Sequence, residues 1–135
     1  MNLPLPATAP TLDVLIVDDE PLICRFVSDV ITLSGHDARA VESPATALQE
    51  LQRRACNLVI TDIRMPCMNG LDLAVTIRET YPWVRILLMS GHYSDVPLSD
   101  PRHRAVDGFL SKPFSITQLM HCVEQATGGS SIPAA

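Results

Sequence analysis

Three carboxylates, one hydroxyl and one lysine stand at the ends of apolar segments, where they could act together on a phosphoryl group. They are Asp18 and Asp19 after the apolar run 14–17, Asp62 after 57–61, Ser90 after 84–89, and Lys112 after 108–111. Phosphoryl transfer to a carboxylate needs a set of this kind. One aspartate attacks phosphorus, while a cation, a lysine and a hydroxyl stabilise the charge on the phosphoryl oxygens.

Two adjacent carboxylates at the end of a core strand oppose folding unless a cation joins them. Like charges about 4 Å apart cost on the order of 4 kcal/mol at an effective dielectric constant of about 20. Mg2+ removes this cost, because it binds a few carboxylates together with waters and a phosphate oxygen. We therefore expect a Mg2+ site where these acids meet.

The segments that must position these residues alternate between strand and helix patterns. Strands are predicted at 13–17, 37–42, 57–61, 84–89 and 108–111, and helices at 21–34, from 44, at about 71–80 and from 116. The alternation predicts an α/β fold: a (βα)5 doubly wound parallel sheet of flavodoxin-like strand order 2-1-3-4-5, in a single domain. Ligands of such sheets bind at the carboxyl ends of the strands, where the strand order reverses, here between the first and third strands.

Local signals mark the ends and inward faces of the predicted helices. The end signals are Pro21 and Gly35 for the first helix, Ser43 and Pro44 for the second, and the capping box Ser115 and Gln118 for the last. The inward residues are Ile23, Phe26, Val27, Val30 and Ile31 in the first helix, Ala47, Leu48 and Leu51 in the second, and Ile116, Leu119, Met120 and Val123 in the last.

The segment 94–105 predicts an irregular fourth helix. Pro97 and Pro101 lie four residues apart, and each costs about 3 kcal/mol inside a helix. We expect a loop through Leu98 and then one short turn, with Ser99 or Asp100 as N-cap and Pro101 in the first position.

Composition restricts the class of protein. The 135 residues carry a formal net charge of −5 and ten scattered basic residues, which argues against direct DNA binding. No apolar run reaches the length of a membrane span, and no pair among the four cysteines has the C-x-x-C spacing of a zinc or redox site. We expect a domain over 12–127 between flexible tails at 1–11 and 128–135, in the cytoplasm.

Four motifs resemble the receiver domains of two-component response regulators, including receivers at the ends of hybrid histidine kinases. They are "VDDEP", "VITDIRMPCMNG", "LLMSGH" and "FLSKPF". The resemblance implies a phosphorylation-dependent switch that takes its phosphoryl group from a histidine kinase or a histidine phosphotransfer protein. It implies Asp62 as phosphoacceptor, Mg2+ bound by Asp18, Asp19, Asp62 and the backbone carbonyl of Arg64, and a phosphoryl group held by Ser90 and Lys112.

The resemblance also implies a cis peptide bond before Pro113 and three further roles. Phe109 would be the rotating aromatic that acts with Ser90 in the switch, although a plain core aromatic is the alternative. Arg64 and His92 would tune the lifetime of the phosphorylated state, unless they are ordinary loop residues. The domain would catalyse its own phosphorylation and dephosphorylation without being an independent enzyme, and its downstream partner is unknown.

Two other classes of protein stay open. A pseudo-receiver would keep the fold as an interaction module without phosphorylation, but the full set of acids, Ser90 and Lys112 argues against it. A Mg2+-dependent phosphatase or nuclease of related topology is the other class. A haloacid-dehalogenase-type phosphatase would carry a second aspartate two residues after the nucleophile, where this chain has Arg64.

Overall fold

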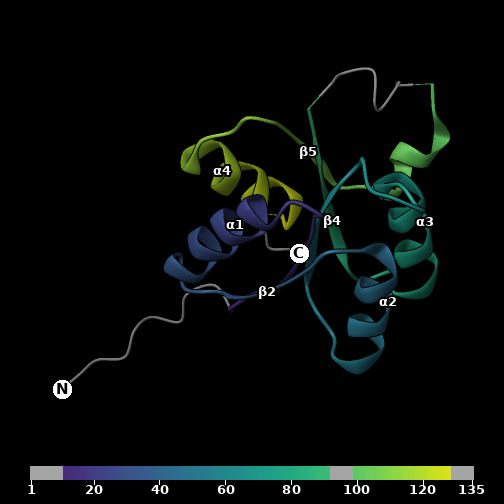
Figure 1. Ribbon diagram of the computed structural model, residues 1–135, viewed down its shortest axis with the longest axis horizontal. Helices are drawn as coiled ribbons and strands as arrows, with labels where there is room; N and C mark the ends of the chain where they lie inside the picture. Colours follow the sequence, from purple (N-terminus) through teal and green to yellow (C-terminus); the bar gives the residue numbers. More distant parts are fainter. Residues whose placement is uncertain (1–10, 92–98, 129–135) are drawn as a thin grey trace.

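Five parallel strands form one sheet in the order β2-β1-β3-β4-β5 (Figure 1). The computed structural model describes residues 11–91 and 99–128. Its strands are β1 Asp13–Val17, β2 Asp37–Val41, β3 Leu58–Asp62, β4 Arg85–Ser90 and β5 Gly108–Ser111. Its helices are α1 Pro21–Leu33, α2 Pro44–Arg53, α3 Gly70–Thr80 and α4 Ile116–Ala126, with a 3-10 turn, η2, at Pro101–Ala105. The predicted (βα)5 parallel sheet and its strand order are confirmed.

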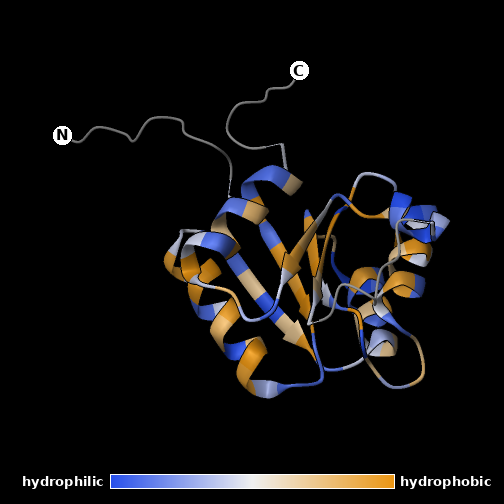
Figure 2. Cartoon of the chain, turned by 90° about the horizontal axis from the view of Figure 1, so that it is seen from above, coloured by the Kyte–Doolittle hydropathy of each residue, from blue (hydrophilic) through white to orange (hydrophobic). Residues whose placement is uncertain are grey.

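Helices cover both faces of the sheet. Helices α1 and α4 pack on one face, and α2, α3 and η2 pack on the other (Figure 1). The central strand β3 is buried along its whole length, whereas β2 lies at an edge and is only partly covered. Apolar residues gather in the strands and on the helix sides that face them, as the orange segments of Figure 2 show. This rigid sheet fixes the positions of the residues that end its strands.

The local signals at the helix ends work as predicted. Ser43 accepts a hydrogen bond from the backbone of Thr46, and Ser115 and Gln118 form both bonds of a capping box. Gly35 follows α1 with a φ of 93°, a left-handed conformation that suits glycine. Asp100 caps η2 through the backbone N–H of Arg102, so the predicted N-cap of the short turn is confirmed.

Two residues predicted to face the core lie outside the buried core. Phe26 on α1 is 36% exposed, because the buried stripe of that helix runs through Cys24 and Val27 instead. Its ring packs at the margin of this stripe against Phe114, with ring centroids 5.9 Å apart. Ile116 is 56% exposed, because α4 first buries a residue one turn later, at Leu119.

Within the crossover from β4 to β5, the structure describes Gly91 and residues 99–107. As the prolines predict, residues 99–107 contain the short turn η2, which begins with Pro101 in the first position and is followed by Val106 in an extended conformation. Residues 94–98, to which the same prediction extends, lie outside the described residues, and so do most of the tails predicted to be flexible. Among the described helices, none is long and apolar enough to cross a membrane.

Candidate functional site

Three carboxylates meet at the carboxyl edge of the sheet. Asp18 directly follows β1, and Asp62 is the last residue of β3, the neighbouring strand. Each of Asp18, Asp19 and Asp62 offers a carboxylate oxygen within 4.8 Å of the others. Asp18 and Asp62 are buried whereas Asp19 is exposed, so the cluster opens to solvent on the Asp19 side.

Lys112 is the cation of this cluster. Its Nζ lies 3.0 Å from Asp62 Oδ1, 3.1 Å from Asp18 Oδ2 and 3.4 Å from Glu20 Oε1. The lysine follows β5, and its backbone N–H donates to the carbonyl of Ser90 at 2.8 Å. The peptide bond between Lys112 and Pro113 is cis, as the family resemblance implies.

The electrostatics of the pocket follow from burial and from an excess of acids. Desolvation raises the pKa of Asp18 and of Asp62, and hydrogen bonds from Lys112 only partly offset it. Burial also opposes the charged form of Lys112, but its hydrogen bonds to Asp62 and Asp18 outweigh that effect and raise its pKa. One ammonium group facing buried acids leaves net negative charge, so the pocket favours a further cation.

The donor set suits a hard divalent cation such as Mg2+. The three clustered aspartates offer carboxylate oxygens, and no histidine or cysteine belongs to the described cluster. Asp18 uses Oδ1 to accept the backbone N–H of Glu20 at 2.9 Å, which fixes the orientation of its carboxylate. A cation here would be held by preoriented oxygens.

Three of the other predicted site residues lie on β4, on β5 and in the loop after β3. Ser90 is the last residue of β4 and is half-buried. Arg64 is exposed in the loop that leaves β3. Phe109 lies on the edge strand β5 with 46% of its surface exposed, so it is not a plain core aromatic. His92 lies outside the described residues.

Sequence reasoning missed two residues that shape the pocket. Glu20 adds a third carboxylate to the surroundings of Lys112, and its place directly after Asp18 and Asp19 was the available signal. Gly70 begins α3 against the backbone of β3, where an added Cβ would overlap the carbonyl oxygen of Asp62. No local pattern reveals this second contact, because it depends on how α3 approaches the strand.

The fold and site define a class: flavodoxin-like α/β proteins with an acidic pocket and a lysine at the switch point of the sheet. Within that class, this chain belongs to the family described as the response regulator receiver domain, whose model matches residues 14–124. It is therefore a receiver domain of two-component response regulators, and the predicted family is confirmed.

Similar proteins of known sequence are longer than this chain. The response regulator protein FleR of Pseudomonas aeruginosa is 39% identical over 111 residues, which cover 82% of this chain and 23% of FleR. The response regulator protein TodT of Pseudomonas putida is 30% identical over 115 residues, 84% of this chain and 50% of TodT. The chain thus spans about a quarter to a half of the length of these relatives.

Solved structures share the whole domain. The response regulator TrrA of Thermotoga maritima, solved in complex with Mg(2+)-BeF, superposes with a TM-score of 0.79 at 28% identity, covering 86% of this chain and 99% of TrrA. The chemotaxis response regulator CheY4 of Vibrio cholerae gives a TM-score of 0.78 at 25% identity, covering 87% of this chain and 99% of CheY4.

Proposed function

We propose that this domain is a phosphorylation switch in which Asp62 accepts a phosphoryl group from a phosphohistidine. The donor would be a histidine kinase or a histidine phosphotransfer protein, the partners that membership of the receiver family implies. The observation that carries the proposal is the position of Asp62. Its carboxylate ends the central strand, lies 3.0 Å from Lys112 Nζ, and shares a 4.8 Å cluster with two further acids.

In the proposed reaction, a carboxylate oxygen of Asp62 attacks phosphorus. The phosphorus–nitrogen bond of the donor breaks, and its electron pair stays on the ring nitrogen. The phosphoimidazole ring carries a proton on its other nitrogen, so it leaves as neutral imidazole, and the product is an acyl phosphate on Asp62. Lys112 leaves its contact with the Asp62 carboxylate and pairs with a phosphoryl oxygen instead, while the Ser90 hydroxyl donates to another. These residues stabilise charge and hold the phosphoryl group, and none has to move a proton.

Mg2+ would be held by Asp18, Asp19, Asp62 and the backbone carbonyl of Arg64. When bound, it would neutralise charge on the phosphoryl oxygens and on the acids. The solved complex of the relative TrrA with Mg(2+)-BeF supports this assignment by analogy. Asp19 is the most accessible of the three acids, so it offers the route by which the ion enters.

We further assign the conformational response to Ser90 and Phe109. A Ser90 hydroxyl drawn toward a phosphoryl group on Asp62 would vacate space on the β4 side, and the exposed ring of Phe109 on the adjacent strand β5 could turn inward. Arg64 is two residues after Asp62 in the sequence, and His92 is two residues after Ser90. Both side chains would limit the access of water to the acyl phosphate, which sets its lifetime.

Phosphorylation by acetyl phosphate tests the proposal. The wild-type domain with Mg2+ should gain the mass of one phosphoryl group, and hydroxylamine, which cleaves acyl phosphates but not phosphate esters, should remove it. Asp62→Asn should gain nothing. The matched control is Asp29→Asn, which changes an exposed aspartate on α1 outside the cluster and should be phosphorylated like the wild type. Phosphorylation of Asp62→Asn at the wild-type rate would disprove the assignment, and a wild type that takes no phosphoryl group would favour a pseudo-receiver.

A further inference from the structure

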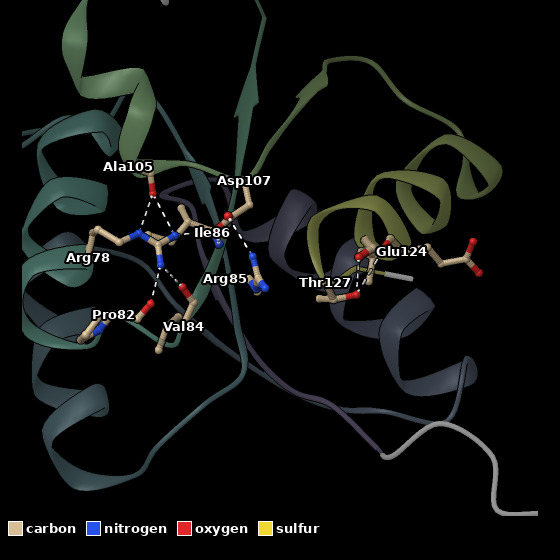
Figure 3. Close-up of polar contacts among 10 residues, drawn as sticks. Arg78, Pro82, Val84, Arg85, Ile86, Ala105, Asp107, Glu124 and Thr127 are labelled. Carbon is tan, nitrogen blue, oxygen red and sulfur yellow. Dashed lines mark hydrogen bonds and ion pairs between the residues drawn. The ribbon is translucent and has the colours of Figure 1, made fainter. Parts of the chain in front are cut away.

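A single arginine on α3 joins three separate segments of the chain at the amino end of β5. Arg78 has five N–H donors, and every one of its nitrogens is used (Figure 3). Nε and Nη2 donate to the carbonyl of Ala105 at 3.2 and 3.0 Å, and Nη1 donates to the carbonyls of Pro82 and Val84 at 2.8 and 2.7 Å. Nη2 also donates to Asp107 Oδ2 at 2.6 Å.

Asp107 passes this attachment on to the neighbouring strand. Its Oδ2 accepts the backbone N–H of Ile86 at 2.9 Å, and its own N–H donates to the carbonyl of Ile86 at 2.7 Å. Asp107 is thus bonded on both sides to one residue of β4, directly before the ladder begins at Leu87 and Gly108. We define Arg78 and Asp107 as the clamp.

The strand that follows the clamp has few buried side chains to set its register. β5 has four residues, lies at the edge of the sheet, and buries only Leu110. Register is strongly specified where one face of a strand is buried, and weakly specified where few side chains distinguish the faces. Leu110 alone is a small anchor, so the bonds of Asp107 to Ile86 carry much of the specification.

Lys112 stands at the other end of the same strand. It lies five residues after Asp107, about 16 Å along an extended chain. A slip of β5 by one residue would move Lys112 by about 3.3 Å along the strand. Its Nζ could then no longer keep both the 3.0 Å contact with Asp62 and the 3.1 Å contact with Asp18.

We propose that Arg78 and Asp107 are positioning residues that set the register of β5 and thereby place Lys112 against the phosphoacceptor. The inference rests on the proposed function, since it assigns how the lysine of that site is held. The clamp is well suited to the task because its two side chains are mostly covered, with 27% and 21% of their surfaces exposed. A charge-assisted hydrogen bond in such surroundings is stronger than one at an open surface.

A double-mutant cycle tests whether the clamp acts through Lys112. Arg78→Met keeps the unbranched, apolar part of the side chain but removes all five donors. It should slow phosphorylation by acetyl phosphate by about tenfold or more, because displacements of about 1 Å in a site cost up to about a hundredfold. In a Lys112→Met background the same change should have no further effect, because the lysine that it misplaces is gone. Additive effects of the two substitutions would overturn the proposal.

Two controls separate positioning from loss of stability. Ile77→Val trims a buried residue next to Arg78 and lowers the melting temperature without touching a donor, so it should leave the phosphorylation rate unchanged. Amide exchange gives a readout that does not depend on phosphorylation. In Arg78→Met, the amides of Leu110 and Lys112, the second of which donates to the carbonyl of Ser90, should exchange faster than in Ile77→Val by more than the difference in global stability explains.

A milder variant covers the case in which Arg78→Met does not fold. Asp107→Asn keeps the size of the side chain and an acceptor for Ile86 but removes the charge that holds Arg78. Asp107→Asn should also slow phosphorylation and speed amide exchange in β5, but by less than Arg78→Met. Unchanged exchange at Leu110 and Lys112 in the clamp variants that fold would refute the clamp. A Lys112→Met variant phosphorylated as fast as wild type would instead refute the role of Lys112 in the proposed function.

Discussion

Replacing Gly70 by alanine should displace the phosphoacceptor without changing any charged group. Gly70 is the first residue of α3, and its N–H donates to the carbonyl of Ile63 at 2.8 Å. A Cβ at this position would overlap the carbonyl oxygen of Asp62 and would lie 2.9 Å from Ile63 Cα and 3.0 Å from the Asp62 carbonyl carbon. All three atoms belong to the backbone, so no side-chain rotation can relieve the contact.

The magnitude follows from what must move. Ordinary contacts begin at 3.4 Å, so α3 and the end of β3 have to separate by on the order of 1 Å. Overpacking of this kind costs about 1–3 kcal/mol, and we expect the upper end because backbone yields less than side chains. For a domain of this size, about 3 kcal/mol lowers the melting temperature by roughly 10 °C. Phosphorylation should slow by about tenfold to a hundredfold, because Asp62 moves relative to Lys112.

Two other glycines provide a graded comparison. In Gly108→Ala the nearest atom would be Leu87 Cδ1 at 3.2 Å, the end of a side chain that can adjust. In Gly91→Ala no atom of residues 11–91 or 99–128 lies within 4 Å of the added Cβ, so this variant should be as stable as the wild type or slightly more stable. Thermal unfolding should therefore rank the three variants with Gly70→Ala least stable and Gly91→Ala most stable. A Gly70→Ala variant that melts with Gly91→Ala and is phosphorylated at the wild-type rate would refute the reasoning.

Three further outcomes can be measured on the same domain. Mg2+ at 100 times its dissociation constant should stabilise the wild type by about 2.7 kcal/mol, and Asp19→Asn should lose most of this rise in melting temperature; a wild type that gains nothing would contradict a metal site. Burial raises the pKa of the Cys56 thiol to about 11 from 9.0, so the folded state keeps its proton over a range in which the unfolded state loses it. The stabilisation from the protonated Cys56 thiol is complete below pH 9 and is lost as the pH rises to about 11. In urea unfolding, the wild type should therefore lose about 2–3 kcal/mol of stability relative to Cys56→Ala over that interval. Parallel pH profiles of the two proteins would argue against this stabilisation. Ser115→Ala removes one half of the capping box of α4 and should cost about 1 kcal/mol in the same assay, similar to Ser43→Ala at the start of α2, whereas a loss close to zero would show that the cap is not needed.

Much of the fold could be predicted because its signals are local. The cap at Ser115 needs only Gln118 three residues later, and the short turn η2 needs only Asp100 and Pro101. The two errors on the helices, Phe26 and Ile116, arose where a periodic pattern cannot tell how wide the covered stripe is or where along the helix it begins. The extent of coverage depends on which neighbouring element reaches that surface.

The candidate site divides in the same way. By itself, the sequence determined that acids, a hydroxyl and a lysine end adjacent strands, because apolar runs fix the strands and the right-handed crossovers of a doubly wound sheet bring their carboxyl ends to one edge. Only the tertiary structure decided that Lys112 contacts Asp18, 94 residues away, and shares its charge with Glu20 and Asp62. Contacts of this kind, like those of Gly70 with the β3 backbone, depend on the packing of side chains from distant segments, and no spacing within the sequence encodes that packing.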